Sequence, residues 1–422
     1  MKTLYIFNYQ REIPPFMLSQ LVTIARLFDK VYYTSPSLSN RSLVEDDPQY
    51  SNIRLLTFNR WVRLKQYFFG LTSPFRPAFW KNIRDLGLSF ANLKNTMKSY
   101  FCIAGMEAVT KKRLKRSVRE GDVCVMAAWF DICAIATSRA KRRHPEIEAE
   151  SFAHAFEIDA ARDRYSYRAF AEEKHSLIDR VHFISQVKLD NYYKSLAHKH
   201  IKERYGDKVQ VSYLGSFNHS DALNPQPETD APFHIVTCSR TSSEKRVHLM
   251  CDTLRHWHGS RVIWTHIGSG TLDEDLKKRA NELTANNHLV TVELPGGKRN
   301  DEVLEYYKTI PVDLFVNVSD TEGIPVSVME AASFGIPCAA TDVGGTKELV
   351  DNTMGWLIPC NFSPKDFCKE IMNYRDSDLS TKTAMRNAAH NIWSKGFNAA
   401  KNNKILWNGV IKRMIQNSKN RL

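Results

Sequence analysis

Short apolar runs and helical patterns alternate through the second half of the chain. The first β-rich run, FHIVTCS, begins at Phe233, and the last, IPCAAT, ends at Thr341, with helical spacing between most neighbours. This alternation is typical of βαβ units, whose parallel strands are buried on both faces of one sheet. Their crossovers are right-handed, and ligands bind where the carboxyl ends of the strands meet. We therefore predict a Rossmann-like, doubly wound α/β domain over residues 233–395.

The first half of the chain shows the same alternation less regularly. Seven β-rich runs precede residue 216: TLYIFNY, KVYYTSP, IRLLTF, DVCVMAAW, IEAESFAH, RVHFISQ and KVQVSYLG. They predict a second Rossmann-like domain over residues 1–215, with the two domains facing a central cleft. The aperiodic, proline-containing stretch 216–232 is typical of a linker between them.

The last stretch, 396–422, has the spacing of a basic amphipathic helix. Ile405, Leu406, Val410 and Ile411 lie on or near one face of that helix. We expect the helix to return to the N-terminal domain.

Composition indicates an ordinary soluble globular protein. Of its 422 residues, 43% are hydrophobic and 25% are charged. The most apolar stretch, residues 123–138, contains Asp131 and is shorter than the roughly 20 residues of a membrane span. The N-terminus lacks a signal-peptide pattern, and the eight cysteines form no CxxC pair. We therefore expect a cytoplasmic protein with reduced thiols.

Two glutamates, Glu322 and Glu330, flank the predicted start of a helix that follows the run VDLFVNVS. Pro325 suits the first turn of this helix, which places Glu322 in the loop and Glu330 about two turns along. The free N–H groups of a helix N-terminus and its positive dipole end favour an anion between the two acids. Carboxylates accept hydrogen bonds from vicinal hydroxyls, so this arrangement suits a nucleotide diphosphate sugar. The alternative is that Glu330 caps or decorates the helix and Glu322 is a solvated charge in the loop.

Four motifs in order resemble glycosyltransferase family 4, whose members are retaining enzymes of the GT-B fold. EGIPVSVME resembles the family's E-x7-E signature, and SRTSSEKR, with Arg240 and Lys245, resembles its R-x4-K element. Gly268 and Gly270 in HIGSG match its Gly-x-Gly turn. FAHAFEIDAARDRYSY, residues 152–167, resembles the histidine-bearing segment of bacterial polysaccharide-assembly members. The resemblance therefore implies two Rossmann-like domains of the GT-B type.

The resemblance also implies a role for each matching residue. Glu322 would meet the donor sugar's 3- and 4-hydroxyls, Glu330 would hold the ribose, and Arg240 and Lys245 would grip the diphosphate. The turn with Gly268 and Gly270 would lie next to these substrate-binding residues. The nucleotide base would lie against Leu294 to Gly297. Backbone N–H groups for sugar and phosphate would come from the stretch Gly323, Ile324, Pro325 and Val326.

In the N-terminal half, the resemblance places His154 near the sugar's 6-hydroxyl and the reacting carbon. Glu157 falls where relatives often carry an acid, so it is either an acceptor-binding residue or a solvated charge.

The reaction implied is retaining transfer of a hexose from a UDP- or GDP-sugar to a lipid-linked glycan in surface polysaccharide biosynthesis. Fixed cations would stabilise the leaving diphosphate, so no metal and no cofactor is expected. Two alternatives remain at this point. One is a nucleic-acid-binding protein, and the other is a GT-B epimerase or phosphorylase.

Most of the chain's excess positive charge lies in residues 60–119. This segment holds fourteen Lys/Arg against Asp85 and Glu107, and its first part is rich in aromatic residues: Trp61, Tyr67, Phe68, Phe69, Phe75, Phe79 and Trp80. Such a mixture suits an anionic membrane surface or single-stranded nucleic acid, and a folded insertion with core aromatics is the third interpretation. We favour peripheral binding to the inner face of a membrane and expect no nucleic acid.

Overall fold

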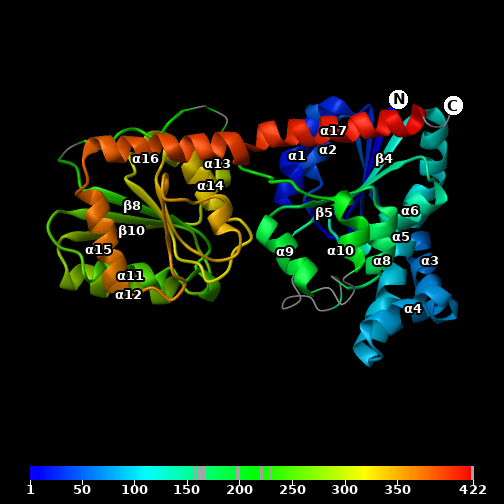
Figure 1. Cartoon of the computed structure of the whole chain (residues 1–422), viewed down its shortest axis with the longest axis horizontal. Helices are drawn as coiled ribbons and strands as arrows, with labels where there is room; N and C mark the ends of the chain where they lie inside the picture. Colours follow the sequence, from blue (N-terminus) through cyan, green and yellow to red (C-terminus); the bar gives the residue numbers. More distant parts are fainter. Residues whose placement is uncertain are drawn as a thin grey trace. The chain divides into compact units, whose positions relative to one another are not determined.

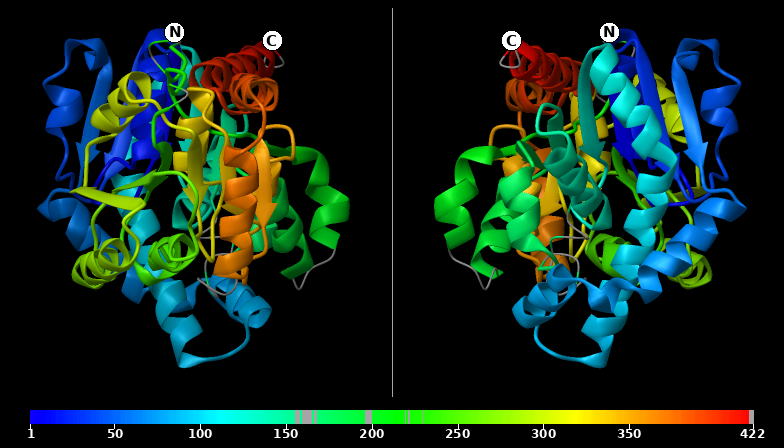
Figure 2. Two further views of the ribbon diagram at one scale, coloured as in Figure 1. Left: turned by 90° about the vertical axis from the view of Figure 1, so that its left-hand side faces the viewer. Right: turned by 90° about the vertical axis from the view of Figure 1, so that its right-hand side faces the viewer.

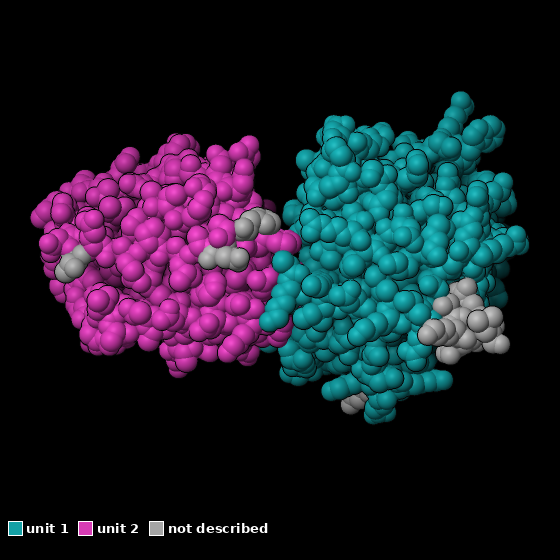
Figure 3. Space-filling model, turned by 90° about the horizontal axis from the view of Figure 1, so that it is seen from above, with its two compact units in different colours: residues 1–212, 400–422 teal, residues 213–399 magenta. Residues whose placement is uncertain are grey.

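The computed structural model describes residues 1–154, 158, 165, 168–195, 200–218, 220, 222–228 and 230–419. The chain forms two compact units, coloured separately in Figure 3. Unit 1 contains Met1–Ser212 and Ala400–Leu422, and unit 2 contains Tyr213–Ala399. Each unit is a parallel β-sheet with helices packed against it (Figure 1).

The sheet of unit 1 has seven strands in the order β3-β2-β1-β4-β5-β6-β7. All neighbours are parallel, as the seven β-rich runs predicted. The strands are β1 (Lys2–Phe7), β2 (Lys30–Ser35), β3 (Ile53–Thr57), β4 (Asp122–Ala127), β5 (Glu148–Ala153), β6 (Arg180–Phe183) and β7 (Val209–Val211).

Several helices of unit 1 begin after a residue whose side chain caps them. Asn59 accepts a hydrogen bond from the Val62 amide and Ser89 accepts one from the Asn92 amide, at 3.0 and 3.1 Å. The helices are α1 (Pro15–Leu27), α2 (Ser42–Glu45), α3 (Arg60–Leu71), α4 (Pro77–Leu86), α5 (Phe90–Glu120), α6 (Ile132–Arg143), α8 (Ala171–Leu177), α9 (Gln186–Ser195), α10 (His200–Tyr205) and α17 (Ala399–Lys419).

The sheet of unit 2 has six parallel strands in the order β10-β9-β8-β11-β12-β13. Five of them are the predicted runs, and β13 was missed because its four residues, GWLI, are too short to show a pattern. The strands are β8 (Phe233–Cys238), β9 (Val262–Ile267), β10 (Val290–Gly296), β11 (Leu314–Asn317), β12 (Cys338–Thr341) and β13 (Gly355–Ile358). The helices are α11 (His248–Leu254), α12 (Asp273–Asn286), α13 (Asn300–Thr309), α14 (Val326–Ser333), α15 (Pro364–Arg375) and α16 (Leu379–Ile392).

Helix α17 packs against unit 1. Trp407 is fully buried and donates a hydrogen bond from Nε1 to Oε1 of Gln20 in α1, at 3.1 Å. Val410 and Met414 continue this buried face, whereas Ile405 is exposed. The predicted return to the N-terminal part of the chain is therefore confirmed. Of the predicted apolar face, Val410 is buried, Leu406 and Ile411 are half-buried and Ile405 is exposed, and the indole ring of Trp407 joins the buried side.

The stretch 216–232, predicted as a linker, is held by unit 2. The Asn224 side chain donates hydrogen bonds to the carbonyls of Tyr307 and Ile310, at 2.6 and 2.7 Å. The buried guanidinium of Arg386 donates to the Asn224 carbonyl at 2.9 Å. Much of this stretch is therefore fixed to one domain, because its backbone groups need partners.

The segment between β3 and β4 forms three helices, α3, α4 and α5. Helix α5 has 31 residues and spans about 46 Å, whereas the six-residue strand β4 that follows it spans about 20 Å. Figures 1 and 2 accordingly show α3, α4 and the start of α5 extending beyond the sheet. No helix within the described part of the chain is long and apolar enough to cross a membrane.

Candidate functional site

Four loops meet at the carboxyl edge of the unit 2 sheet. They follow β8, β9, β11 and β12. The Asp320 amide donates to the Glu244 carbonyl at 2.9 Å, which joins the loop after β11 to the loop after β8. The Gly345 amide donates to the Gly323 carbonyl at 2.6 Å, which joins the loop after β12 to the loop after β11. The loops therefore form one continuous surface.

Glycines allow these loops to touch through their backbones. A Cβ atom on Gly268 would lie 1.7 Å from the Ser239 carbonyl oxygen, and one on Gly270 would lie 2.3 Å from that of Thr241. Gly344 has a φ of 56° and stands where a Cβ would lie 1.9 Å from the Glu322 carbonyl oxygen. Larger residues at Gly268 and Gly270 would push the loop after β9 away from the loop after β8, and one at Gly344 would push the loop after β12 away from Glu322.

Lys245 and Glu322 form an ion pair at the centre of this surface. Lys245 Nζ lies 2.6 Å from Glu322 Oε1, and the side-chain Nδ2 of Asn317 donates a hydrogen bond to the same oxygen at 3.3 Å. Lys245 ends a short 3-10 turn after β8, and Glu322 lies in the loop after β11. The two residues are 77 positions apart in the chain, so the fold brings together two motifs that the sequence separates.

Glu330 is buried in helix α14, with 8% of its surface exposed. Asn300, the first residue of α13, donates a hydrogen bond from Nδ2 to Glu330 Oε1 at 2.6 Å. Burial raises the pKa of Glu330 to about 7, although the Asn300 hydrogen bond opposes this shift. Pro325 precedes the helix as its N-cap, so Glu330 lies little more than one turn along, not two as predicted.

Three other predicted residues lie away from the Lys245–Glu322 ion pair or point to solvent. Arg240 is exposed, and its guanidinium lies 3.3 Å from Glu244 rather than against Glu322 or Glu330. Leu294 lies inside β10, not after it, and packs partly buried against the unit 2 core. Val326, at the first position of α14, is exposed, while Ile324 is buried beneath it.

His154 directly follows β5, at the carboxyl edge of the unit 1 sheet. Its ring is buried between the rings of Phe16 and Trp129, with centroid separations of 4.1 and 4.6 Å. Two aromatic residues therefore fix the plane of the imidazole. Glu157 lies outside the described residues.

Arg246 holds the site together but was not predicted. Its guanidinium donates to the carbonyls of Val318 and Ser319, at 2.9 and 3.2 Å, and its backbone has a left-handed φ of 48°. It thereby ties the loop after β8 to the end of β11. Asn300 and Asn317, which orient the two glutamates, were also missed. The sequence gives no signal for Asn300, and for Asn317 only its place near the end of the predicted strand VDLFVNVS.

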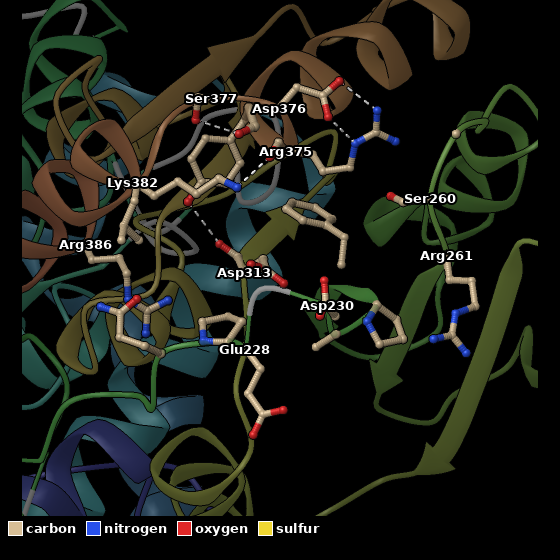
Figure 4. A pocket seen from close by; sticks show the side chains of 18 of the residues that line it. Glu228, Asp230, Ser260, Arg261, Asp313, Arg375, Asp376, Ser377, Lys382 and Arg386 are labelled. Atoms are coloured by element: carbon tan, nitrogen blue, oxygen red, sulfur yellow. Dashed lines mark hydrogen bonds and ion pairs between the residues drawn. The ribbon is translucent and has the colours of Figure 1, made fainter.

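A hollow in unit 2 lies elsewhere. It measures about 900 Å³ and is lined by residues that precede β8, β9, β10 and β11, among them Arg261 and Asp313. Figure 4 shows Arg386 and Lys382 beside it. It therefore lies at the amino edge of the sheet, where the linker residues are anchored, and not at the Lys245–Glu322 pair. In the residues that the structure describes, no three His, Cys, Asp or Glu side chains converge as a metal site.

Comparison with known proteins gives a family match for the second half of the chain. Residues 221–391 match the model of glycosyl transferases group 1. Over 162 residues the chain is 29% identical to WcaL of Escherichia coli K12, which is named for colanic acid biosynthesis, covering 37% of this chain and 39% of WcaL. It is 27% identical over 160 residues to the amylovoran biosynthesis glycosyltransferase AmsK of Erwinia amylovora, covering 36% and 39%. The chain thus matches well under half of these relatives' own length.

Solved structures resemble the whole chain. The crystal structure of Anabaena HepE in complex with UDP superimposes with a TM-score of 0.67 at 14% identity, covering 98% of this chain and 100% of HepE. The lipopolysaccharide outer core galactosyltransferase WaaB gives 0.65 at 14%, covering 98% and 100%. The chain therefore has the GT-B fold, and its residues 221–391 are related to glycosyltransferases of polysaccharide biosynthesis.

Proposed function

We propose that the protein is a glycosyltransferase of surface polysaccharide biosynthesis. It would move a hexose from a UDP- or GDP-sugar to a lipid-linked glycan, with retention of anomeric configuration and without a metal ion. The match of residues 221–391 to group 1 glycosyl transferases supports the class of reaction. The crystal structures of HepE with UDP and with UDP-glucose support a uridine nucleotide as the first donor to test.

The main support for this proposal is the contact between Lys245 and Glu322. A nucleotide diphosphate sugar joins its hexose to its diphosphate through one bond, so groups that bind the two parts must be neighbours. Glu322 and Lys245 are 2.6 Å apart, which suits an acid that accepts hydrogen bonds from sugar hydroxyls beside a cation that faces phosphate. The first amides of α14 lie between Glu322 and Glu330, where a phosphate would meet a helix N-terminus.

Glu330 would bind the ribose. Its carboxyl is buried one turn into α14, on the far side of the helix start from Glu322. A carboxylate there can accept hydrogen bonds from two vicinal hydroxyls, and their donation would satisfy oxygens that are otherwise costly to bury.

The reaction breaks the bond between the sugar's anomeric carbon and the diphosphate oxygen, and the nucleoside diphosphate leaves with the bonding electrons. Lys245 and the exposed Arg240 would stabilise the negative charge that grows on that oxygen. The acceptor hydroxyl attacks from the leaving-group face, and its proton passes to the departing phosphate. His154, held by Phe16 and Trp129, would contact the hexose near its 6-hydroxyl.

Nucleotide binding is the first test. A ligand that binds only the folded protein raises its melting temperature, so UDP-, GDP-, ADP- and dTDP-sugars can be compared in one thermal-shift screen. We expect UDP- or GDP-sugars to raise the melting temperature more than the others. No shift with any of the four would contradict the proposal.

Turnover in Glu322→Gln is the second test. The neutral amide keeps the shape of the side chain but loses the charge-assisted hydrogen bonds to the sugar, so kcat/KM should fall roughly 10- to 100-fold with little change in melting temperature. Glu305→Gln, on the exposed face of α13, is the matched control and should keep its rate. An unchanged rate in Glu322→Gln would remove this residue from the site.

A further inference from the structure

Helix α3 exposes its apolar face. Its buried positions are Val62, Gln66 and Gly70, four residues apart. The side-chain Nε2 of Gln66 donates hydrogen bonds to Tyr9 Oη and to the Phe101 carbonyl, each at 3.2 Å. The opposite face carries Trp61, Leu64, Tyr67, Phe68 and Leu71, all exposed. An ordinary surface helix has the reverse arrangement, with apolar residues inside and polar residues outside.

Exposed apolar side chains continue from α3 into the neighbouring elements. Phe75, in the 3-10 turn before α4, is 88% exposed, and Phe90, the first residue of α5, is 82% exposed. Trp80 and Leu88 are also exposed. Of the seven aromatic residues noted in this segment, only Phe79 is buried, so the interpretation of a folded insertion with core aromatics was wrong for the other six.

We call this set the apolar surface: Trp61, Leu64, Tyr67, Phe68, Phe69, Leu71, Phe75, Trp80, Leu88 and Phe90. Soluble proteins expose single apolar residues commonly but rarely gather ten on three adjoining helices. Such a gathering marks an interaction surface.

The charge around the apolar surface is strongly positive. Residues 60–98 contain eight Lys/Arg and, of the acids, only Asp85. Lys65, Lys81, Arg84 and Lys94 are exposed beside the apolar side chains. Exposed aromatic rings with cations beside them match the acyl boundary and anionic headgroups of a bilayer.

The second basic cluster of the segment is a separate feature. Lys111 to Arg119 lie about 32 to 44 Å along α5 from Phe90, at the end where Arg116 pairs with Glu120. The structure thus divides the basic segment 60–119 into an apolar and basic part and a purely basic part. The second part offers a matched control for the first.

The apolar surface belongs to the carboxyl-edge side of the unit 1 sheet. Gln66 of α3 contacts Tyr9, which follows the end of β1, and the Phe170 amide donates to Asn82 of α4 at 2.8 Å. His154 follows β5 at the same edge. A bilayer bound to these helices would therefore lie on the side of unit 1 that carries His154.

We propose that α3, the 3-10 turn at Ser73–Phe75, α4 and the first turn of α5 bind the surface of an anionic phospholipid bilayer. Trp61, Phe68, Phe75 and Phe90 enter the acyl boundary, and the neighbouring Lys and Arg contact the headgroups. The binding needs no catalytic step. Its consequence for the reaction, that a lipid-linked acceptor reaches the edge carrying His154 directly from the membrane, rests on the proposed function.

Vesicle co-sedimentation tests the proposal. The full chain should bind phosphatidylglycerol-containing vesicles at low salt, bind less at high salt, and bind pure phosphatidylcholine weakly. Phe75→Ser/Phe90→Ser should weaken binding by about tenfold, because two exposed rings no longer enter the acyl boundary. Leu379→Ser, at an exposed apolar residue in unit 2, should leave binding unchanged.

A charge comparison separates the two basic clusters. Lys81→Gln/Arg84→Gln/Lys94→Gln should reduce binding to anionic vesicles more than Lys111→Gln/Lys112→Gln/Lys115→Gln, although both remove three charges. Equal losses would overturn the proposal, since they would reflect net charge alone. The nucleotide-induced thermal shift of both variants should match that of the unaltered chain, so failure of lipid binding is distinguishable from failure of the proposed function.

Other occupants of the apolar surface give different results. If a second copy covers it, sedimentation equilibrium will show a dimer that Phe75→Ser/Phe90→Ser dissociates, and vesicle binding will be absent. If single-stranded nucleic acid covers it, an oligonucleotide will bind with a steep salt dependence that the same variant abolishes. Either result would overturn the proposal.

Discussion

Each unit contains a pair of glutamates beside a cation, but the two pairs occupy opposite kinds of position. In unit 1, Glu148 and Glu150 lie within strand β5 and are almost fully buried. In unit 2, Glu322 lies in a loop and Glu330 near the start of a short helix, both at the carboxyl edge of the sheet. The same residue type can therefore hold a fold together in one place and remain available to a ligand in another.

The unit 1 pair has all its partners inside the protein. The Arg413 guanidinium of α17 donates to Glu148 at 2.8 Å and also to Glu150, which His182 contacts from β6. Burial and the neighbouring Glu150 raise the pKa of Glu148 to about 9. Burial opposes ionisation of Glu150 as well, but His182 and Arg413 outweigh it and lower its pKa. The pair thus fastens α17 to the sheet.

The unit 2 pair lies where strands end. Lys245 and Asn317 contact one oxygen of Glu322, and Asn300 contacts one oxygen of Glu330. These partners come from loops and helix ends, which can shift to admit a ligand more readily than paired strands. Position relative to the sheet, not residue type, therefore separates a structural cluster from a candidate site.

Removing the cation of the unit 1 pair should produce the largest effect. Arg413→Leu leaves the carboxyl groups of Glu148 and Glu150 buried without a cation. We expect it to lower the free energy of unfolding of unit 1 by about 3 kcal/mol. Chemical denaturation followed by circular dichroism measures this change. Lys412→Leu, at an exposed position of the same helix, is the control and should cost little. If Arg413→Leu is as stable as the unaltered chain, the cluster does not fasten α17.

Sequence reasoning found the unit 2 pair and missed the unit 1 pair for a physical reason. Glu148 and Glu150 alternate in a predicted strand, which by itself indicates a solvent-facing side. That side is nevertheless buried, and its cationic partner Arg413 comes from α17, more than 260 positions away. Lys245 and Glu322 were predicted because each lies in a motif at the end of a predicted strand.

Elements with a local signal were predicted, and contacts between distant elements were not. All seven strands of unit 1 follow from short apolar runs, and the start of α14 follows from Pro325. The buried face of α17 depends on which side meets α1, which periodicity does not determine. Asn300 acts on the site through one hydrogen bond and Arg246 through two to backbone carbonyls, so no sequence pattern precedes them.

Gly344→Ala tests how the unit 2 pair depends on loop backbone. The new Cβ would lie 1.9 Å from the Glu322 carbonyl oxygen in a left-handed conformation, so the loop after β11 must move. We expect a loss of about 2 kcal/mol in unfolding free energy, and a fall in kcat/KM and nucleotide affinity even where the variant is folded. Gly396→Ala, where a Cβ has open space, is the control. Unchanged nucleotide affinity in Gly344→Ala would mean that this loop does not shape the site.

A pH dependence distinguishes the two roles of a buried glutamate. The pKa of Glu330 is raised from 4.5 to about 7 by burial, so the folded protein holds a proton there that the unfolded chain has lost. Its contribution to stability is therefore full below pH 4.5 and falls as pH rises toward 7. Nucleotide binding should change in the opposite direction, because ribose hydroxyls donate to the ionised carboxylate.

Calorimetric titration of a nucleotide from low pH to above 7 measures this dependence. Affinity should rise by up to about tenfold per pH unit below the pKa of Glu330 and level off above it. Glu330→Gln removes the titrating proton, so its affinity should stay flat across the range, while Glu305→Gln should retain the slope. A slope that persists in Glu330→Gln would assign the pH dependence to another group, and Glu330 would then resemble Glu148, a buried acid that serves the fold rather than the ligand.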